Sequence, residues 1–77
     1  METLITKKEA ADFVAAEKNS AALLRNLRTY IEELPGETEV PLFLELSRVL
    51  HLVEHTAFDL SEINDFFAQN HQLIGEL

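Results

Sequence analysis

The stretch VPLFLELSRVLHLVEHTAF, residues 40–58, is the most apolar run of the chain and decides how the rest can fold. On a helix that turns about 100° per residue, one arc about 120° wide collects most of its apolar side chains. This arc has the width of an ordinary core-facing stripe. We therefore expect a central helix that ends near residue 57 and buries Leu42, Phe43, Leu46, Val49, Leu50, Val53 and Ala57.

Two leucines of the same stretch fall outside this arc. Leu44 forms a row with Arg48, His51 and His55 at spacings of four, three and four residues, and Leu52 lies beside Arg48. A lone exposed leucine needs no explanation. A helix with extra leucines on its far side, however, often has a second neighbour. We interpret these five residues as a candidate protein-binding face.

A long helix is predicted before the central one. Thr6 and Glu9 have the spacing of a capping box, in which each side chain bonds the other residue's backbone N–H. Residues 7–34 contain no glycine or proline, and their apolar stripe keeps its phase through Ser20. The pattern favours one helix over residues 7–34, with a break at Ser20 as the alternative, and a frayed lead-in over residues 1–5.

Two interruptions are predicted after the first helix. Pro35 and Gly36 end it, because proline disfavours a helical conformation in the residue before it and glycine supplies a turn. Asp59 and Glu62 form a second capping box, so we expect the central helix to stop and a last helix to start there. Asn70 falls on the apolar face of that last helix, where a buried asparagine could fix the register between helices or lie hydrated at the rim.

These elements predict an all-α fold in a single domain over residues 1–77. It is a small three-helix bundle with a long N-terminal helix, or a four-helix bundle if the first helix breaks. The first helix would be roughly 40 Å long at 1.5 Å per residue and would outreach the two shorter helices that cover it. Small domains also need additional stabilisation. We therefore expect a homodimer.

Composition and charge exclude several classes of protein. The chain has 77 residues and no cysteine, which argues against disulfides and thiolate metal sites. Its hydrophobic content of 47% argues against intrinsic disorder despite a net charge of -8. No apolar run approaches the roughly 20 residues of a membrane span, and we expect a cytoplasmic protein. Residues 36–77 carry one basic residue against eight acids. This asymmetry argues against binding to nucleic acid or membranes and suits a basic protein partner.

No residue pattern indicates catalysis. The serines lie in no nucleophile motif, and two glycines cannot build a phosphate-binding loop, so we expect neither an enzyme nor a cofactor. His51 and His55 share a helix face at i, i+4 and could bind a metal ion with an acidic side chain. The sequence therefore predicts a small acidic, non-catalytic interaction protein, such as a regulator, inhibitor or adaptor, that acts as a helical homo-oligomer. Two alternatives stay open: a metal-binding helical protein that uses the histidine pair, and an acidic mimic of nucleic acid that occupies a basic protein site.

Overall fold

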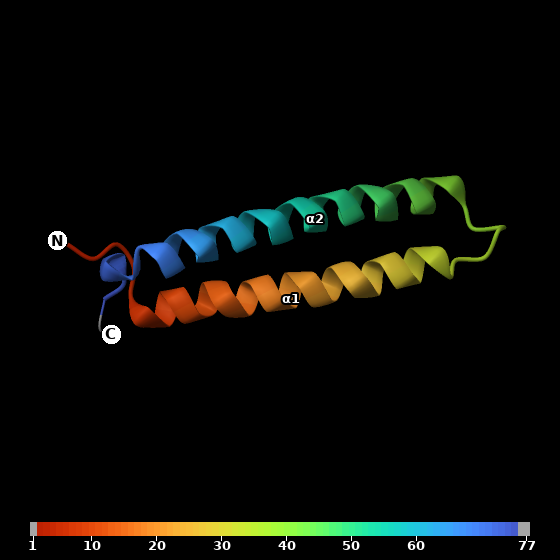
Figure 1. The fold of residues 1–77 in the computed structure, drawn as a ribbon. Coiled ribbons are helices and arrows are strands. Elements are labelled where there is room, and N and C mark those ends of the chain that lie inside the picture. Colours follow the sequence, from red (N-terminus) through yellow and green to blue (C-terminus); the bar gives the residue numbers. More distant parts are fainter. Residues whose placement is uncertain (1, 76–77) are drawn as a thin grey trace.

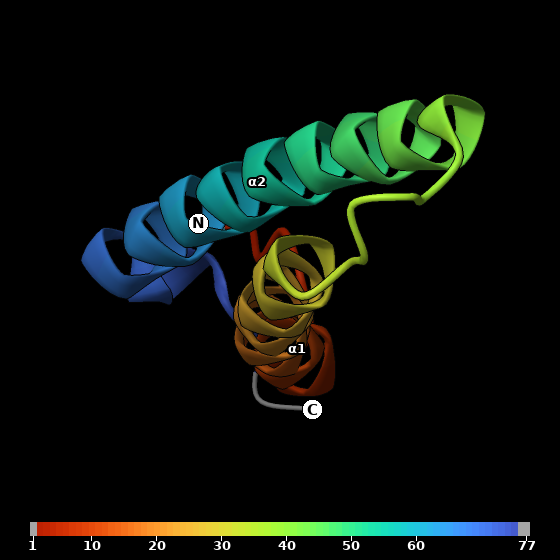
Figure 2. The ribbon, with the colours of Figure 1, turned by 90° about the vertical axis from the view of Figure 1, so that its right-hand side faces the viewer.

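The computed structural model describes residues 2–75, which form a hairpin of two long helices (Figure 1). Helix α1 covers Lys7–Glu32, helix α2 covers Val40–Gln69, and a 3₁₀ turn, η1, covers His71–Leu73. The two helices run antiparallel side by side, in a molecule of 58 × 16 × 14 Å. Figure 2 shows α2 crossing α1 at an angle, with no further layer of the described chain against either helix. The predicted all-α class is confirmed.

Helix α1 begins and continues as its sequence predicts. The Thr6 backbone N–H donates to Glu9 Oε1 at 2.8 Å, and the Glu9 N–H donates to Thr6 Oγ1 at 3.0 Å. The Ser20 hydroxyl donates to the Glu17 carbonyl at 2.9 Å within the helix, so this serine does not cap a second helix. The prediction of one uninterrupted helix is confirmed, with its end at Glu32.

The predicted break at Asp59 is wrong. Helix α2 runs through this position without interruption for 30 residues. Nδ1 of His55 lies 2.8 Å from Oδ2 of Asp59, one turn later, so the carboxylate interacts along the continuous helix. Residues 42–69 also contain no glycine or proline that would end a helix. The predicted three-helix bundle is therefore replaced, in the described chain, by two long helices and a short turn.

The contact between α1 and α2 follows a seven-residue repeat. Half-buried side chains recur at alternating intervals of three and four residues on both helices, which is the pattern of heptad positions a and d in a coiled coil. No residue of the described chain is fully buried. We call this contact the seam: Ala10, Phe13, Glu17, Ser20, Leu24, Leu27, Ile31 and Leu34 from the first half, and Leu46, Leu50, Val53, Ala57, Leu60, Asn64 and Phe67 from α2.

The two ends of the described chain are joined. The Leu4 N–H donates to the Leu73 carbonyl at 2.6 Å, and the Gly75 N–H donates to the Ile5 carbonyl at 2.7 Å. Ile5 and Ile74 also form an isolated parallel β-bridge. The expectation of a frayed lead-in is wrong for residues 4–5, because backbone hydrogen bonds tie them to the segment that follows α2.

The last segment also differs from its predicted form. Asn70 is the C-terminal cap of α2, and its Nδ2 donates to the Phe66 carbonyl at 2.8 Å. It therefore caps the helix and does not lie in the middle of an apolar helix face. The expected helix beyond Asn70 is replaced by η1, and residues 76–77 lie outside the described residues.

Candidate protein-protein interface

The predicted face on α2 is solvent-exposed but not continuous. Leu44 and Leu52 are 61% and 54% exposed. Eight residues separate them, which turns their side chains about 80° apart around the helix axis. Leu52 consequently lies beside Val49 on one side of the hairpin, whereas Leu44 lies on the other side. The structure thus does not gather the two leucines into one patch.

The charged members of that face pair with acids of the same helix. Arg48 lies 3.7 Å from Glu45, and His51 lies 3.8 Å from Glu54. These pairs are exposed, and exposed pairs contribute little to stability. His55 forms the shorter contact with the Asp59 carboxylate already described. Arg48, His51 and His55 are therefore a solvated surface in this arrangement.

The histidine pair lacks the surroundings of a metal centre. Within residues 2–75, no three or more histidine, aspartate or glutamate side chains are arranged to hold a metal ion. A tetrahedral zinc site needs four ligands, three of them from protein in catalytic sites. Metal binding at His51 and His55 stays a prediction.

A polar contact lies in the seam near the open end of the hairpin. Nδ2 of Asn64 donates to Oε1 of Glu17 at 2.7 Å and to the Phe13 carbonyl at 3.0 Å. Both side chains are half-buried among apolar neighbours. A polar pair in a helix seam favours one alignment of the helices, because any slip leaves the polar groups without partners. Asn64 could have been placed in the seam from the sequence, because a seven-residue repeat counted from Leu46 through a continuous α2 reaches it.

The seam divides the hairpin surface into two flanks. In an antiparallel pair, heptad positions e of the two helices face each other, and positions g do the same. Arg28 and Glu54 occupy e positions, and their side chains meet at 3.4 Å. This ion pair marks the flank formed by positions e and b and agrees with the heptad assignment. We call this surface the polar flank, although it also carries four exposed apolar side chains, Val14, Val40, Leu44 and Phe58.

The opposite flank, formed by positions g and c, is apolar. Seven of the thirteen exposed large apolar side chains of the described residues lie on it. Their exposed fractions range from 37% for Ile63 to 57% for Tyr30, so solvent reaches all of them. We call this surface the apolar flank: Leu23 and Tyr30 of α1, and Leu42, Val49, Leu52, Ile63 and Phe66 of α2.

The surface of the apolar flank is hollowed near the C-terminal part of α2. A shallow hollow of about 410 Å³ lies beside Ile63 and Phe66 and is bordered by Asp59. The rings of Phe66 and Phe67 meet edge to face with centroids 5.2 Å apart. Phe67 belongs to the seam, so this aromatic contact links the apolar flank to the interior of the hairpin.

Acidic side chains border the apolar flank. The g and c positions that are not apolar include five carboxylates, Glu9, Asp12, Glu33, Glu45 and Asp59, which we call the acidic rim. All six lysines and arginines of the chain occupy positions e, b or f: Lys7, Lys8, Lys18, Arg25, Arg28 and Arg48. The apolar flank therefore has acidic neighbours and lacks basic ones among the described residues.

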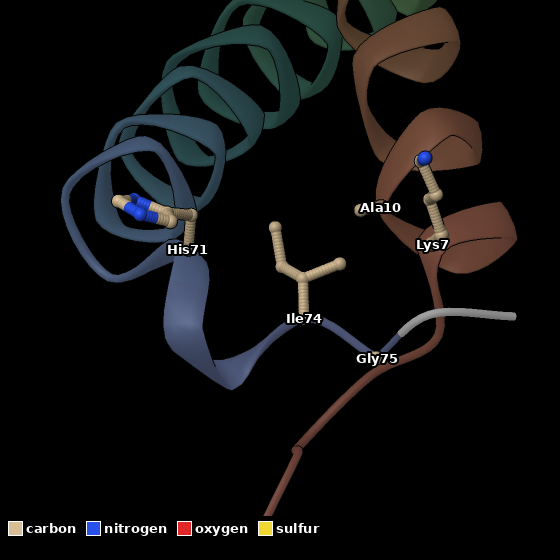
Figure 3. Close-up of a pocket in the computed structure, with 5 residues that line it drawn as sticks. All are labelled: Lys7, Ala10, His71, Ile74 and Gly75. Carbon is tan, nitrogen blue, oxygen red and sulfur yellow. The ribbon is translucent and has the colours of Figure 1, made fainter.

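A second hollow lies where the chain ends meet (Figure 3). Its volume is about 300 Å³, and Ile74 and Ala10 give it an apolar floor. Lys7 and His71 stand on opposite sides, and their side chains do not turn toward each other. The hollow thus lacks the convergent polar groups of a small-molecule site.

Comparison with known proteins adds no assignment. The chain matches no protein family, no curated protein and no solved structure. Neither described helix combines the length and the apolar character that crossing a bilayer requires.

Proposed function

We propose that this chain is a small non-catalytic protein interaction module whose binding surface is the apolar flank. One observation carries the proposal: the described hairpin has no fully buried residue, while seven large apolar side chains gather on one side. Exposed apolar side chains gathered on one surface are typical of protein-binding sites. The acidic, non-catalytic character expected from the sequence agrees with this role.

The energetics of a two-helix hairpin support the same function. Burial of apolar surface contributes about 25 cal/mol per Å², and a chain of this size buries a limited fraction of its surface on folding. Covering the apolar flank would add stabilisation that α1 and α2 cannot supply to each other. Association is therefore expected to stabilise the fold as well as to perform the function.

A second candidate is a homodimer that pairs two apolar flanks, which would make the chain a helical homo-oligomer. The original reason for a dimer, a first helix longer than its covers, no longer holds because α2 is the longer helix. The exposed apolar flank now favours this candidate, since two copies would form a four-helix arrangement. Regulator, inhibitor and adaptor remain equal descriptions of what such a module does.

The apolar flank is tested with an environment-sensitive dye and paired variants. We expect the isolated chain either to bind the apolar dye ANS as a monomer or to form a dimer by light scattering. Val49→Asp should abolish the dye binding or the dimerisation, whichever the parent chain shows. Leu44→Asp, an equally apolar-to-acidic change on the polar flank, should leave it intact. If the two variants behave alike while both retain their helical circular dichroism, the apolar flank is not the binding surface.

The other two candidate functions predict different results. Stoichiometric zinc uptake that His51→Ala with His55→Ala abolishes would support metal binding. An acidic mimic of nucleic acid would bind a nucleic-acid enzyme with strong salt dependence, because its contacts are charge pairs between exposed groups. That binding would not respond to Val49→Asp, which adds an acid to an already acidic surface.

A further inference from the structure

We propose that the apolar flank receives an amphipathic helix of a partner protein that carries lysine or arginine on both sides of its apolar stripe. This inference rests on the proposed function and names the chemistry of the partner.

The shape suits a helix. Because α1 and α2 run antiparallel side by side, the g positions of both helices lie along the same flank of the hairpin (Figure 1), and a shallow hollow lies beside Ile63 and Phe66. From Leu42 to Phe66, the apolar flank extends about 36 Å along α2, which equals a partner helix of about 24 residues. An amphipathic helix that packs on an apolar surface presents anchors at spacings of three, four and seven residues.

The border selects the charge of that helix. Glu45 and Asp59 lie at c positions of α2, and Asp12 and Glu33 lie at c positions on the α1 side. A helix packed along the apolar flank would place its own flanking side chains next to these carboxylates. Lysine and arginine can cover apolar surface with their stems and reach the carboxylates with their charged ends. Acidic flanking residues would meet like charges instead.

The ion pairs that the acidic rim forms within the chain do not prevent it from binding a basic helix. Glu45 contacts Arg48 at 3.7 Å with both side chains about 70% exposed, a geometry worth little in water. Asp59 contacts His55, which is itself exposed. A basic helix could therefore replace or join these contacts at small cost.

The same border disfavours a second copy of the chain. Pairing two apolar flanks would bring two acidic rims together, and none of the six basic residues lies at a g or c position to compensate. Like charges across an interface suppress association. A foreign basic helix obtains the same apolar burial without this repulsion.

Two synthetic peptides of 24 residues test the inference. Both carry the same leucine stripe at a and d spacing; one has lysine and the other glutamate at the flanking positions. We expect fluorescence anisotropy to detect binding of the lysine peptide and an affinity at least about tenfold lower for the glutamate peptide, a difference of 1.4 kcal/mol. Affinity for the lysine peptide should fall as salt is raised.

Variants of the chain separate the specific site from general attraction to an acidic protein. Val49→Asp should abolish binding of the lysine peptide, and Leu52→Asp serves the same purpose if the first variant loses helicity. Asp59→Lys should weaken binding several-fold. Glu37→Lys makes the same charge change in the α1–α2 connection, away from the apolar flank, and should have a smaller effect. Equal effects of Asp59→Lys and Glu37→Lys, or binding that survives both aspartate variants, would overturn the inference.

The outcomes also separate this inference from the function on which it rests. If both peptides bind equally and Val49→Asp abolishes both, the basic partner is wrong and the interaction surface stands. If neither binds and the chain is a dimer that Val49→Asp dissociates, a second copy occupies the flank. If Val49→Asp changes neither peptide binding, dye binding nor mass, both proposals fail.

Discussion

Asn64 is the seam residue whose replacement has the clearest physical consequence. Its amide donates two hydrogen bonds across the seam, one of them to the Glu17 carboxylate at 2.7 Å. Asn64→Asp would place a carboxylate where that donor lies and face it toward a like charge. We expect a loss of about 2 kcal/mol in unfolding free energy at pH 7, measured by urea titration.

The pH dependence of this variant identifies the cause. The introduced carboxyl group would have a higher pKa in the folded chain than in the unfolded chain, because its charged form is repelled there. Its destabilising effect is therefore full above the folded pKa and disappears as the pH falls below the unfolded one. A deficit that stays constant between pH 7 and pH 3 would indicate lost packing instead. Asn64→Leu, which removes the donor without adding charge, is the control.

Asn64 also shows what sequence reasoning missed at the residue scale. The sequence indicates that a polar residue in an apolar face could fix the register, and this reasoning selected Asn70. The error came from the predicted break at Asp59, because the segment after it was projected as a separate helix with its own apolar face. Counted from Leu46 through a continuous helix, the seam reaches Asn64, whereas Asn70 follows the last turn and caps it.

The capping box of α1 gives a second residue-scale prediction. Thr6→Ala removes the hydroxyl that accepts from the Glu9 N–H, and we expect a loss of about 1 kcal/mol in urea unfolding at pH 7. The backbone N–H of Thr6, and then its hydroxyl, hold the pKa of Glu9 below its ordinary value. The stabilisation from Glu9 is thus present above its unfolded pKa and is lost as the pH falls through its folded pKa.

The matched control for the capping box changes the other partner. Glu9→Gln keeps a side chain that can accept from the Thr6 N–H but removes the charge. Its stability should therefore vary less with pH over the acidic range than that of the parent chain. Identical pH profiles for the two proteins would mean that the Glu9 carboxylate does not contribute through this hydrogen bond.

At the scale of elements, the continuity of α2 decides how the surface is divided. The capping-box spacing of Asp59 and Glu62 suggested two helices, each with its own apolar face. Helix α2 in fact carries two sets of apolar side chains, one in the seam and one on the apolar flank. Leu42, Phe43 and Val49 were predicted to be buried, but each is more than a third exposed, and Leu42 and Val49 lie on the apolar flank.

Hydrogen exchange tests this continuity. At a helix start, the first four backbone N–H groups have no partner within the helix and exchange quickly. In the continuous helix, the amides of residues 59–62 bond carbonyls one turn earlier and should be protected like those of residues 52–55. Fast exchange confined to residues 59–62 would restore the two-helix interpretation. The amides of Val40 and Leu42, at the true start of α2, provide the internal reference, because Pro41 has no N–H and the Phe43 N–H already donates to the Glu39 carbonyl.

At the scale of the whole molecule, the sequence predicted the helical class and the position of the connection but not the number of long helices. Pro35 and Gly36 interrupt the helix by local chemistry, which a sequence displays directly. Whether a capping motif such as Asp59 with Glu62 starts a helix depends on neighbours, since the carboxylate can pair with His55 instead. The apolar flank could not be predicted from either helix alone, because residues of α1 and α2 form it together.

The balance between apolar attraction and charge repulsion on the apolar flank predicts how the isolated chain responds to salt. At about 20 mM NaCl, the acidic rims of two copies repel each other, whereas at 1 M NaCl the screening length falls to about 3 Å and the repulsion is largely removed. Apolar attraction is not weakened by this screening. We therefore expect light scattering to show a monomer at low salt and a growing share of dimer at high salt.

Two variants show whether the dimer formed at high salt uses the apolar flank. Val49→Asp should stay monomeric at both salt concentrations, because it places a charge in the centre of the contact. Asp59→Lys should dimerise more readily than the parent chain at low salt, because it removes one repelling charge from each rim and adds an attracting one. A parent dimer that is equally stable at both salt concentrations would mean that the rims do not face each other. In that case, the preference for a foreign basic helix over a second copy would lose its electrostatic basis.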